Sequence, residues 1–275
     1  MRPARLICAA LVVICAWATP RAQTTSDLHA PFDRVLDTYV RDGYVYYRAL
    51  KSERAVLDRY IQSLDVPAAQ VAGWSHDAQL AFWLNAYDAL VLRSVIDAYP
   101  IKPVTTDYPA KSIRQIPGAF ERVLHRVAGQ SLTLDAIEQG KILALGDARA
   151  VVAIGRGALG GGRLRSEVFR AERLNAQLED ALKEFVGRAT IFKIDEDQKT
   201  LMVSPLFGWR QAAFIASFDK TARWPERSAL ERALVEMAAP KLFPSERSFL
   251  LQNTFQLTYG TFDWRLNDLT GGIPN

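Results

Sequence analysis

Asn85 and Asp88 are the polar interruptions in residues 80–92, a stretch that is otherwise apolar on nearly every face. They are three residues apart, so they lie on nearly the same face of the buried helix that this pattern predicts. An unsatisfied buried polar group costs about 1 to 3 kcal/mol, and a charge costs more, so both side chains need partners. Two interpretations follow: the pair binds backbone groups of a covering loop, or it forms the floor of a polar pocket.

A glycine-dense stretch at residues 155–162 follows an apolar run at residues 150–154, which we predict to be a short strand. Its glycines include the G-x-G-x-x-G spacing that lets a dinucleotide pyrophosphate approach backbone amides at a helix start. A dinucleotide site also needs an acidic residue at the end of a second strand, about 20 residues further on. That position, Asp180, falls inside a predicted helix. The sequence therefore favours a glycine-rich turn, and no cofactor is expected.

Histidine is scarce, and no histidine has a partner that would suit catalysis or metal binding. His29, His76 and His125 are the histidines of the chain, and none is paired with another histidine or an acid at metal-ligand spacing. A Gly-x-Ser-x-Gly elbow, which would mark a serine hydrolase, is missing as well. We therefore expect no metal site, and structural or surface roles for the histidines.

The first residues have the layout of a secretory signal peptide: a basic start, an apolar run at residues 6–18, and small residues at its end. This run is shorter than the roughly 20 residues that span a bilayer. We predict a signal peptide over residues 1–18, a periplasmic or secreted mature protein, and no stable membrane insertion after cleavage. Both cysteines, Cys8 and Cys15, lie in the signal, so the mature chain is expected to have no thiol.

Composition and charge are typical of a soluble globular protein, with 49% hydrophobic and 23% charged residues. Residues 1–18 contain two arginines and no acidic residue, so the mature chain has 32 basic and 30 acidic side chains. These charges are interleaved along the chain, whereas nonspecific nucleic-acid binding needs clustered cations. We therefore expect no nucleic-acid partner. The length favours a single domain over residues 19–275.

Hydrophobic periodicity predicts helices separated by short hairpins. The expected helices are residues 32–40, 56–64, 75–99, 135–145, 174–185, 205–218 and 228–239. The expected hairpins are residues 123–134 and 191–203, with a last strand at 255–259. A proline-punctuated segment of about 20 residues follows the long helix and is expected to be a lid or a covering loop. We predict the α+β class: a single, mostly helical domain with small antiparallel β-hairpins around a buried central helix.

Six short blocks follow one another in order along residues 32–267. They begin at Asp42, Ala81, Leu132, Asp147, Leu164 and Phe262, and read DGYVYY, AFWLNAYDAL, LTLDAIE, DAR, LR and FDWRLN. Together they resemble, in this order, the signature blocks of the bacterial and plant domain of unknown function 547 family. Six ordered blocks are far more specific than any one of them. The resemblance implies an uncharacterised family, for which no general activity is established.

Compared with that family, the chain lacks the reactive residues. Gln139 and Val151 stand at histidine positions, Gly155-Arg156 at an Asn-Cys pair, Gly161 at a second cysteine, Gly162-Arg163 at Pro-Pro, and Asp88 at an asparagine. Glycine and arginine supply neither a thiolate nor a tunable base, so the nucleophilic or redox chemistry of such residues is excluded here. The resemblance therefore implies a degenerate, noncatalytic member whose pocket still binds a ligand.

Three arginines beside the glycines make a small anion the expected ligand. Arg156, Arg163 and Arg165 offer forked donors, and glycine exposes backbone amides. The other interpretation is an eroded surface loop with solvated arginines, because glycine runs are also what a lost site leaves behind.

The predicted function is an exported binding or accessory module, with no catalytic residue assigned. The residues expected to line its ligand site are Asn85, Tyr87, Asp88, Glu138, Arg149, Arg156, Asp263 and Trp264. The alternative is a hydrolase or transferase with Asp88 and Glu138 as an acid–base pair in the same pocket and Asp263 as support. The identity of a protein partner stays open.

Overall fold

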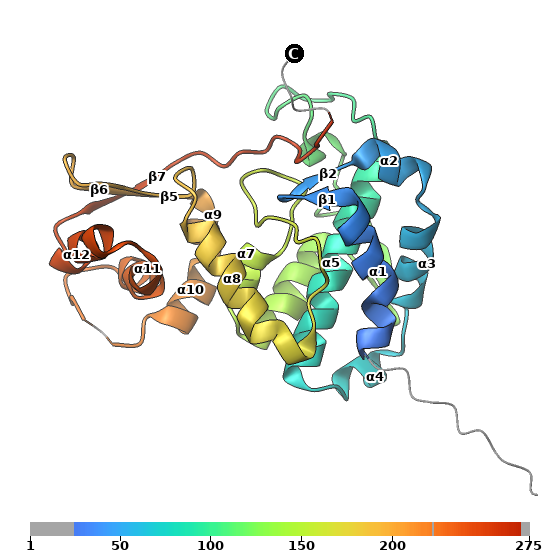
Figure 1. Ribbon diagram of the computed structural model, residues 1–275, viewed down its shortest axis with the longest axis horizontal. Helices are drawn as coiled ribbons and strands as arrows, with labels where there is room; N and C mark the ends of the chain where they lie inside the picture. The colour runs from blue at the N-terminus through green and yellow to red at the C-terminus, as the bar shows by residue number, and fades with distance from the viewer. Residues whose placement is uncertain (1–24, 222, 271–275) are drawn as a thin grey trace, which may run out of the picture.

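The computed structural model describes residues 25–221 and 223–270. The predicted signal peptide and both cysteines lie outside these residues. The described chain is dominated by helices, with short strands in hairpins and one small sheet (Figure 1). The predicted mostly helical α+β class is therefore confirmed.

The α-helices are α1 (Thr25–Tyr39), α2 (Tyr47–Ser52), α3 (Ala55–Ser63), α4 (Ala68–Ala72), α5 (His76–Ala98), α6 (Leu134–Ile137), α7 (Arg149–Ala153), α8 (Leu174–Val186), α9 (Pro205–Trp209), α10 (Gln211–Phe218), α11 (Ala229–Ala238) and α12 (Pro244–Gln252). Short 3₁₀ helices lie at Ile113–Gln115, Leu143–Leu145, Ala171–Arg173 and Ala239–Lys241, and a π-helix lies at Glu138–Ile142. The strands are β1 (Val40–Arg41), β2 (Tyr44–Val45), β3 (His125–Val127), β4 (Gln130–Leu132), β5 (Phe192–Asp195), β6 (Thr200–Val203) and β7 (Gln256–Tyr259).

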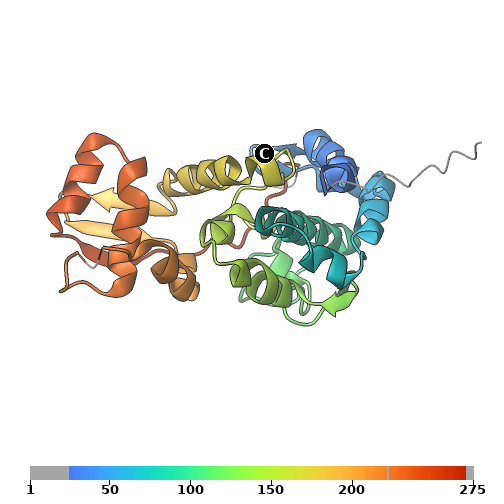
Figure 2. The same ribbon diagram turned by 90° about the horizontal axis from the view of Figure 1, so that it is seen from below.

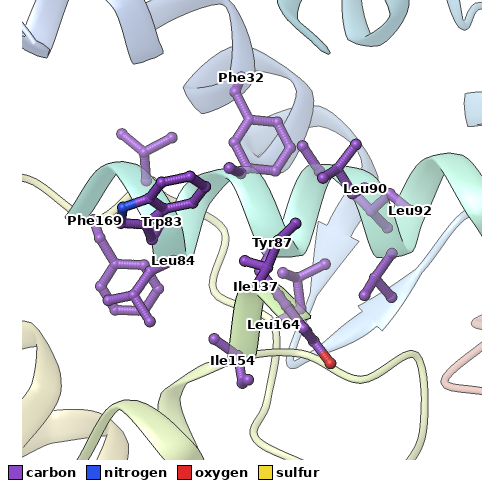
Figure 3. Packing of buried hydrophobic residues seen from close by; sticks show 14 of the residues in the cluster. Phe32, Trp83, Leu84, Tyr87, Leu90, Leu92, Ile137, Ile154, Leu164 and Phe169 are labelled. Carbon is purple, nitrogen blue, oxygen red and sulfur yellow. The ribbon is translucent and has the colours of Figure 1, made fainter. Parts of the chain in front are cut away.

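Helix α5 is the centre of the first hydrophobic cluster, as its apolar sequence predicts. Its first turn is capped by Ser75, whose hydroxyl accepts a hydrogen bond from the Ala78 amide. Phe32 of α1 packs on one side of α5, and Ile137 and Ile154 lie on the other (Figure 3). Each large side chain buried in this way contributes about 1.5 to 3 kcal/mol, so the helix is held mainly by packing on all its faces.

A second hydrophobic cluster is formed by β5–β7 and α9–α12 together with parts of α7 and α8. Helices α7 and α8 contribute to both clusters: Leu178 of α8 belongs to the first, and Leu182, one turn later, to the second. In both views α8 runs between the two groups of elements (Figures 1 and 2). The single domain over residues 19–275 stays a prediction.

The strands form two antiparallel hairpins, β1–β2 and β3–β4, and one mixed sheet in the order β5-β6-β7. Strands β5 and β6 are the predicted second hairpin, and β7 joins β6 in parallel. After β7 the chain returns to the first cluster (Figure 1), where the Val45 amide donates to the Asn267 carbonyl at 2.8 Å. This return places residues 260–267 beside the glycine-rich loop.

Some predicted elements differ in the structure. The apolar run at residues 150–154, predicted as a strand, forms helix α7 instead. A short apolar run that is buried on all sides has no period that separates strand from helix, so the prediction was wrong for a physical reason. Helices α2, α4 and α12 were not predicted. No helix within the described residues is long and apolar enough to cross a membrane.

Candidate functional site

Asn85 and Asp88 hold two covering segments of backbone against α5. The Asn85 amide accepts from the Phe169 N–H at 2.8 Å and donates to the Phe169 carbonyl at 2.9 Å. The Asp88 carboxyl accepts from the Gly155 N–H at 2.8 Å. Both side chains are buried, so each satisfies a backbone group that water does not reach. The geometry matches the framework interpretation of this pair.

The glycine-rich loop is packed against other segments, and several of its amides have acceptors in the structure. The Leu159 N–H donates to the Arg265 carbonyl at 3.0 Å, and the Gly160 N–H donates to the Asp263 carbonyl at 2.8 Å. A Cβ at Gly162 would lie 2.2 Å from the Val152 carbonyl oxygen, so only glycine fits there. The glycines therefore allow close approach of backbone segments, and their amides do not form an anion cradle.

The three arginines of the loop do not converge, because each is paired with a different acid. Arg156 is buried and pairs with Glu138 at 2.5 Å. Arg163 pairs with Glu184 at 3.1 Å, and Arg165 pairs with Glu167 at 2.6 Å. The three arginines therefore pair with separate acids and do not gather around one shared anion.

A different set of polar groups surrounds a cavity of about 320 Å³ next to the loop. It lies between the proline-punctuated segment, the turn at residues 134–142, the α9–α10 junction and the returning C-terminal segment. Its lining residues are Tyr108, Arg114, Phe120, Asp135, Glu138, Gln139, Arg156, Leu206, Trp209, Arg210 and Trp264. The volume lies at the small end of the range for small-molecule sites, about 300 to 1,000 Å³.

Glu138 connects the packed loop to this cavity. One oxygen, Oε1, accepts from Arg156 Nη2 at 2.5 Å and from Arg210 Nε at 2.8 Å. The other, Oε2, accepts no hydrogen bond from the described residues. Burial raises the pKa of Glu138, but the charges of Arg156 and Arg210 outweigh it, so the pKa is below its ordinary value and the group is ionised. Glu138 also begins the π-helix, a feature frequent at functional sites.

Arg210 reaches the cavity because the helix predicted at residues 205–218 is broken there. The structure divides this segment into α9 and α10, and Arg210 lies between them with φ −120° and ψ 26°. The break turns both Trp209 and Arg210 toward the cavity. Arg210 Nη2 makes no hydrogen bond to the described residues. It is therefore a charged donor with capacity for a ligand.

Asp135 and Gln139 line the cavity on the same helical turn as Glu138. Within the described ranges, neither side chain makes a hydrogen bond. Burial raises the pKa of Asp135, and the neighbouring charges of Glu121 and Glu138 raise it further. Gln139 is exposed and stands where the resemblance puts a family histidine.

Aromatic rings form the remaining wall of the cavity. The rings of Trp209 and Trp264 are nearly parallel, with an interplanar angle of 21° and centroids 6.2 Å apart. The guanidinium carbon of Arg114 lies 4.7 Å from the Trp264 centroid and 5.0 Å from that of Phe120, a cation–π arrangement. Arg114 also pairs with Glu121, so its charge is already compensated.

The predicted ligand residues are distributed over several places. Glu138, Arg156 and Trp264 line the cavity, whereas Asp88 is not among its lining residues. Tyr87 is fully buried, and its hydroxyl has no partner among the described residues.

The other two residues expected at the site, Arg149 and Asp263, lie in ion pairs outside this cavity, and Asp263 lines a second, larger cavity of about 890 Å³ beside the glycine-rich loop. Arg149 pairs with Asp147 at 2.7 Å, and Asp263 pairs with Arg265 at 2.6 Å. In contrast, Arg114, Asp135, Trp209 and Arg210 were not predicted. Asp135 lies inside the LTLDAIE block, so the sequence did mark this position. Arg114, Trp209 and Arg210 lie outside the six blocks.

The protein is therefore of the mostly helical α+β class, with a buried central helix and a cavity lined by aromatic rings and arginines. A family model described as "Protein of unknown function, DUF547" matches residues 71–186. The family resemblance predicted from the sequence blocks is therefore confirmed over this central segment. No curated protein and no solved structure matches the chain. Within the described residues there is no group of three or more potential metal-ligating side chains.

Proposed function

We propose that this protein is an exported, noncatalytic binding or accessory module whose cavity at Glu138 takes a small anionic ligand. The supporting observation is the charge balance of the cavity wall. One carboxylate, Glu138, is shared by two guanidinium groups, Arg156 and Arg210. This triad has an excess positive charge, and the unpartnered Nη2 of Arg210 is the donor that an anion would meet.

The noncatalytic part of the proposal rests on the engagement of the buried carboxylates. Glu138 is held by two arginines through Oε1, and Asp88 binds the Gly155 amide. An acid–base pair of Asp88 and Glu138 needs both groups at one cavity, and Asp88 is not in the lining. Export, to the periplasm or the medium, is proposed from the signal pattern of residues 1–18.

Thermal unfolding of the mature protein with increasing acetate, at constant ionic strength set by chloride, tests the proposal. A bound anion stabilises the folded state by about 2.7 kcal/mol at a hundredfold excess over its dissociation constant. We expect Arg210→Gln to lose most of the acetate-dependent shift.

The matched control is Arg173→Gln, which removes an exposed arginine paired with Glu167 at 3.1 Å, outside the cavity lining. It should keep the acetate response of the wild type. Equal acetate responses in wild type and Arg210→Gln would contradict an anion site at this cavity.

A further inference from the structure

Resting on the proposed anion site, we infer that the ligand class is a sugar acid: a hydroxylated ring that bears one carboxylate. Three properties of the cavity carry this inference. They are the hydrogen-bond acceptors without donors, the aromatic wall and the unpartnered donor of Arg210.

The acceptors of the cavity exceed what a bare anion can satisfy. Asp135 offers a carboxylate without hydrogen bonds, Glu138 offers Oε2, and Gln139 offers a free amide oxygen. Glu138 is ionised, and its second oxygen accepts no hydrogen bond from the described residues, so it is open to a ligand donor. A simple anion only accepts hydrogen bonds, so it supplies no donor to these acceptors. Hydroxyl groups donate and accept, so a polyhydroxylated ligand fits this wall.

The aromatic side of the cavity suits a ring. Trp209 and Trp264 present nearly parallel faces whose π clouds are electron-rich, and such faces attract the weakly positive C–H groups of a saturated ring. Trp209 is 49% exposed, so part of its indole is available to a ligand. The 320 Å³ volume limits the ligand to about one ring.

The remaining polar contact selects a carboxylate on that ring. Arg210 Nη2 is the donor left over after Arg210 Nε has bound Glu138. Arg114 pairs with Glu121 through Nη1 and lies on Trp264, and its buried Nε is a second donor without a partner among the described residues. One carboxylate at Arg210, with hydroxyls toward Asp135 and Gln139, satisfies donors and acceptors together.

Isothermal titration calorimetry with D-glucuronate, D-galacturonate, D-glucose and acetate tests this inference on the mature protein. We expect one of the two uronates to bind at least about tenfold more tightly than glucose and acetate, because it alone uses both walls. Asp135→Asn and Trp264→Leu should weaken uronate binding about tenfold or more and leave acetate binding unchanged. Arg210→Gln should reduce uronate affinity to the level of glucose, and Arg173→Gln should change nothing. Circular dichroism and thermal melts of each variant check that it is folded.

The alternative results separate this inference from the proposed function. Acetate binding as tight as uronate binding would overturn the sugar-acid class and leave the anion site standing. Glucose binding as tight as uronate binding, unaffected by Arg210→Gln, would overturn both. Binding of acetate with no binding of either uronate would overturn the inference alone.

Discussion

The glycine-rich loop at residues 155–162 and the cavity at Glu138 are neighbours, but they differ in how many of their polar groups have hydrogen-bond partners. In the loop, amides and carbonyls bind one another, and Arg188 donates to the Leu159 and Gly161 carbonyls at 3.1 and 2.8 Å. In the cavity, Asp135 and Gln139 make no hydrogen bonds with the described residues. The loop has the more conspicuous sequence and lines a larger cavity of about 890 Å³, but the carboxylate and amide groups without hydrogen bonds lie in the cavity at Glu138. Free polar groups, rather than unusual composition, indicate a ligand site.

Asp88 anchors the loop, and its protonation is expected to have the largest effect. Burial raises the pKa of this carboxyl from 3.8 to about 8, against the opposing influence of the Gly155 amide and Arg156. Between about pH 4 and about pH 8 the folded state therefore holds a proton that the unfolded chain has lost. The stability from this group is fully present below pH 4 and falls as pH rises, by at most about 6 kcal/mol over the window.

We expect Asp88→Asn to remove this pH dependence, because the amide stays neutral and keeps an oxygen for the Gly155 N–H. The resemblance puts asparagine at this position in the family. Urea unfolding of both proteins between about pH 5 and about pH 8 measures the difference. Parallel stability curves for wild type and Asp88→Asn would show that Asp88 is not a buried, protonated anchor.

Glu138 belongs to both regions, and its removal is the next largest expected effect. Glu138→Ala leaves Arg156, which is 4% exposed, without its ionic partner. Breaking a buried pair in this way costs about 3 to 5 kcal/mol, whereas replacing both partners by apolar residues is often nearly neutral. The double variant Glu138→Leu with Arg156→Met should recover most of the loss in urea unfolding. A single variant no less stable than the double one would contradict the role of Arg156 as a framework charge.

Much of the fold could be predicted from periodicity, because packing repeats along an element. Helix α5 was predicted at residues 75–99 and lies at His76–Ala98. A continuous apolar run of this length is too long for a buried strand, so it indicates a buried helix. The run at residues 150–154 is too short for its period to choose between strand and helix, so α7 was missed. The parallel pairing of β7 with β6 joins strands that are distant in sequence, and no local pattern encodes it.

The site could be predicted only in part. Glu138 and Trp264 lie in motif blocks, and the structure brings both to the cavity. Arg156 was predicted as an anion ligand because arginines beside glycines suit one, but the sequence does not reveal that Glu138 already neutralises it. Arg210 reaches the cavity only because the helix is broken there, and tertiary packing alone determines that Trp209 is exposed. Trp209 and Arg210 lie together at the α9–α10 junction, and Arg210 is 72 residues from Glu138, so local spacing carries no signal.

The packing of the loop predicts that its glycines are structural. Alanine at Gly162 would bring its Cβ to 2.2 Å from the Val152 carbonyl oxygen and 2.8 Å from that of Ile154, both rigid backbone atoms. We expect Gly162→Ala to destabilise the protein by about 3 kcal/mol, as overpacking does. Gly140→Ala is the matched control, because a Cβ there meets nothing within 4 Å. Similar denaturation midpoints for the two variants would mean that the loop is loose, as the erosion interpretation holds.

The smallest expected change in stability is at Gln139. This residue tests whether the cavity wall, unlike the loop, can be altered without loss of stability. Its side chain is exposed, lines the cavity, and makes no hydrogen bond within the described part of the chain. Truncation therefore removes no framework contact, and Gln139→Ala should change the unfolding free energy by less than about 0.5 kcal/mol. The same variant should weaken uronate binding several-fold, because a ligand hydroxyl loses its acceptor. Melts and calorimetry on one preparation measure both quantities. A stability loss as large as that of Gly162→Ala would mean that the cavity wall is framework like the loop, and that the two regions do not differ.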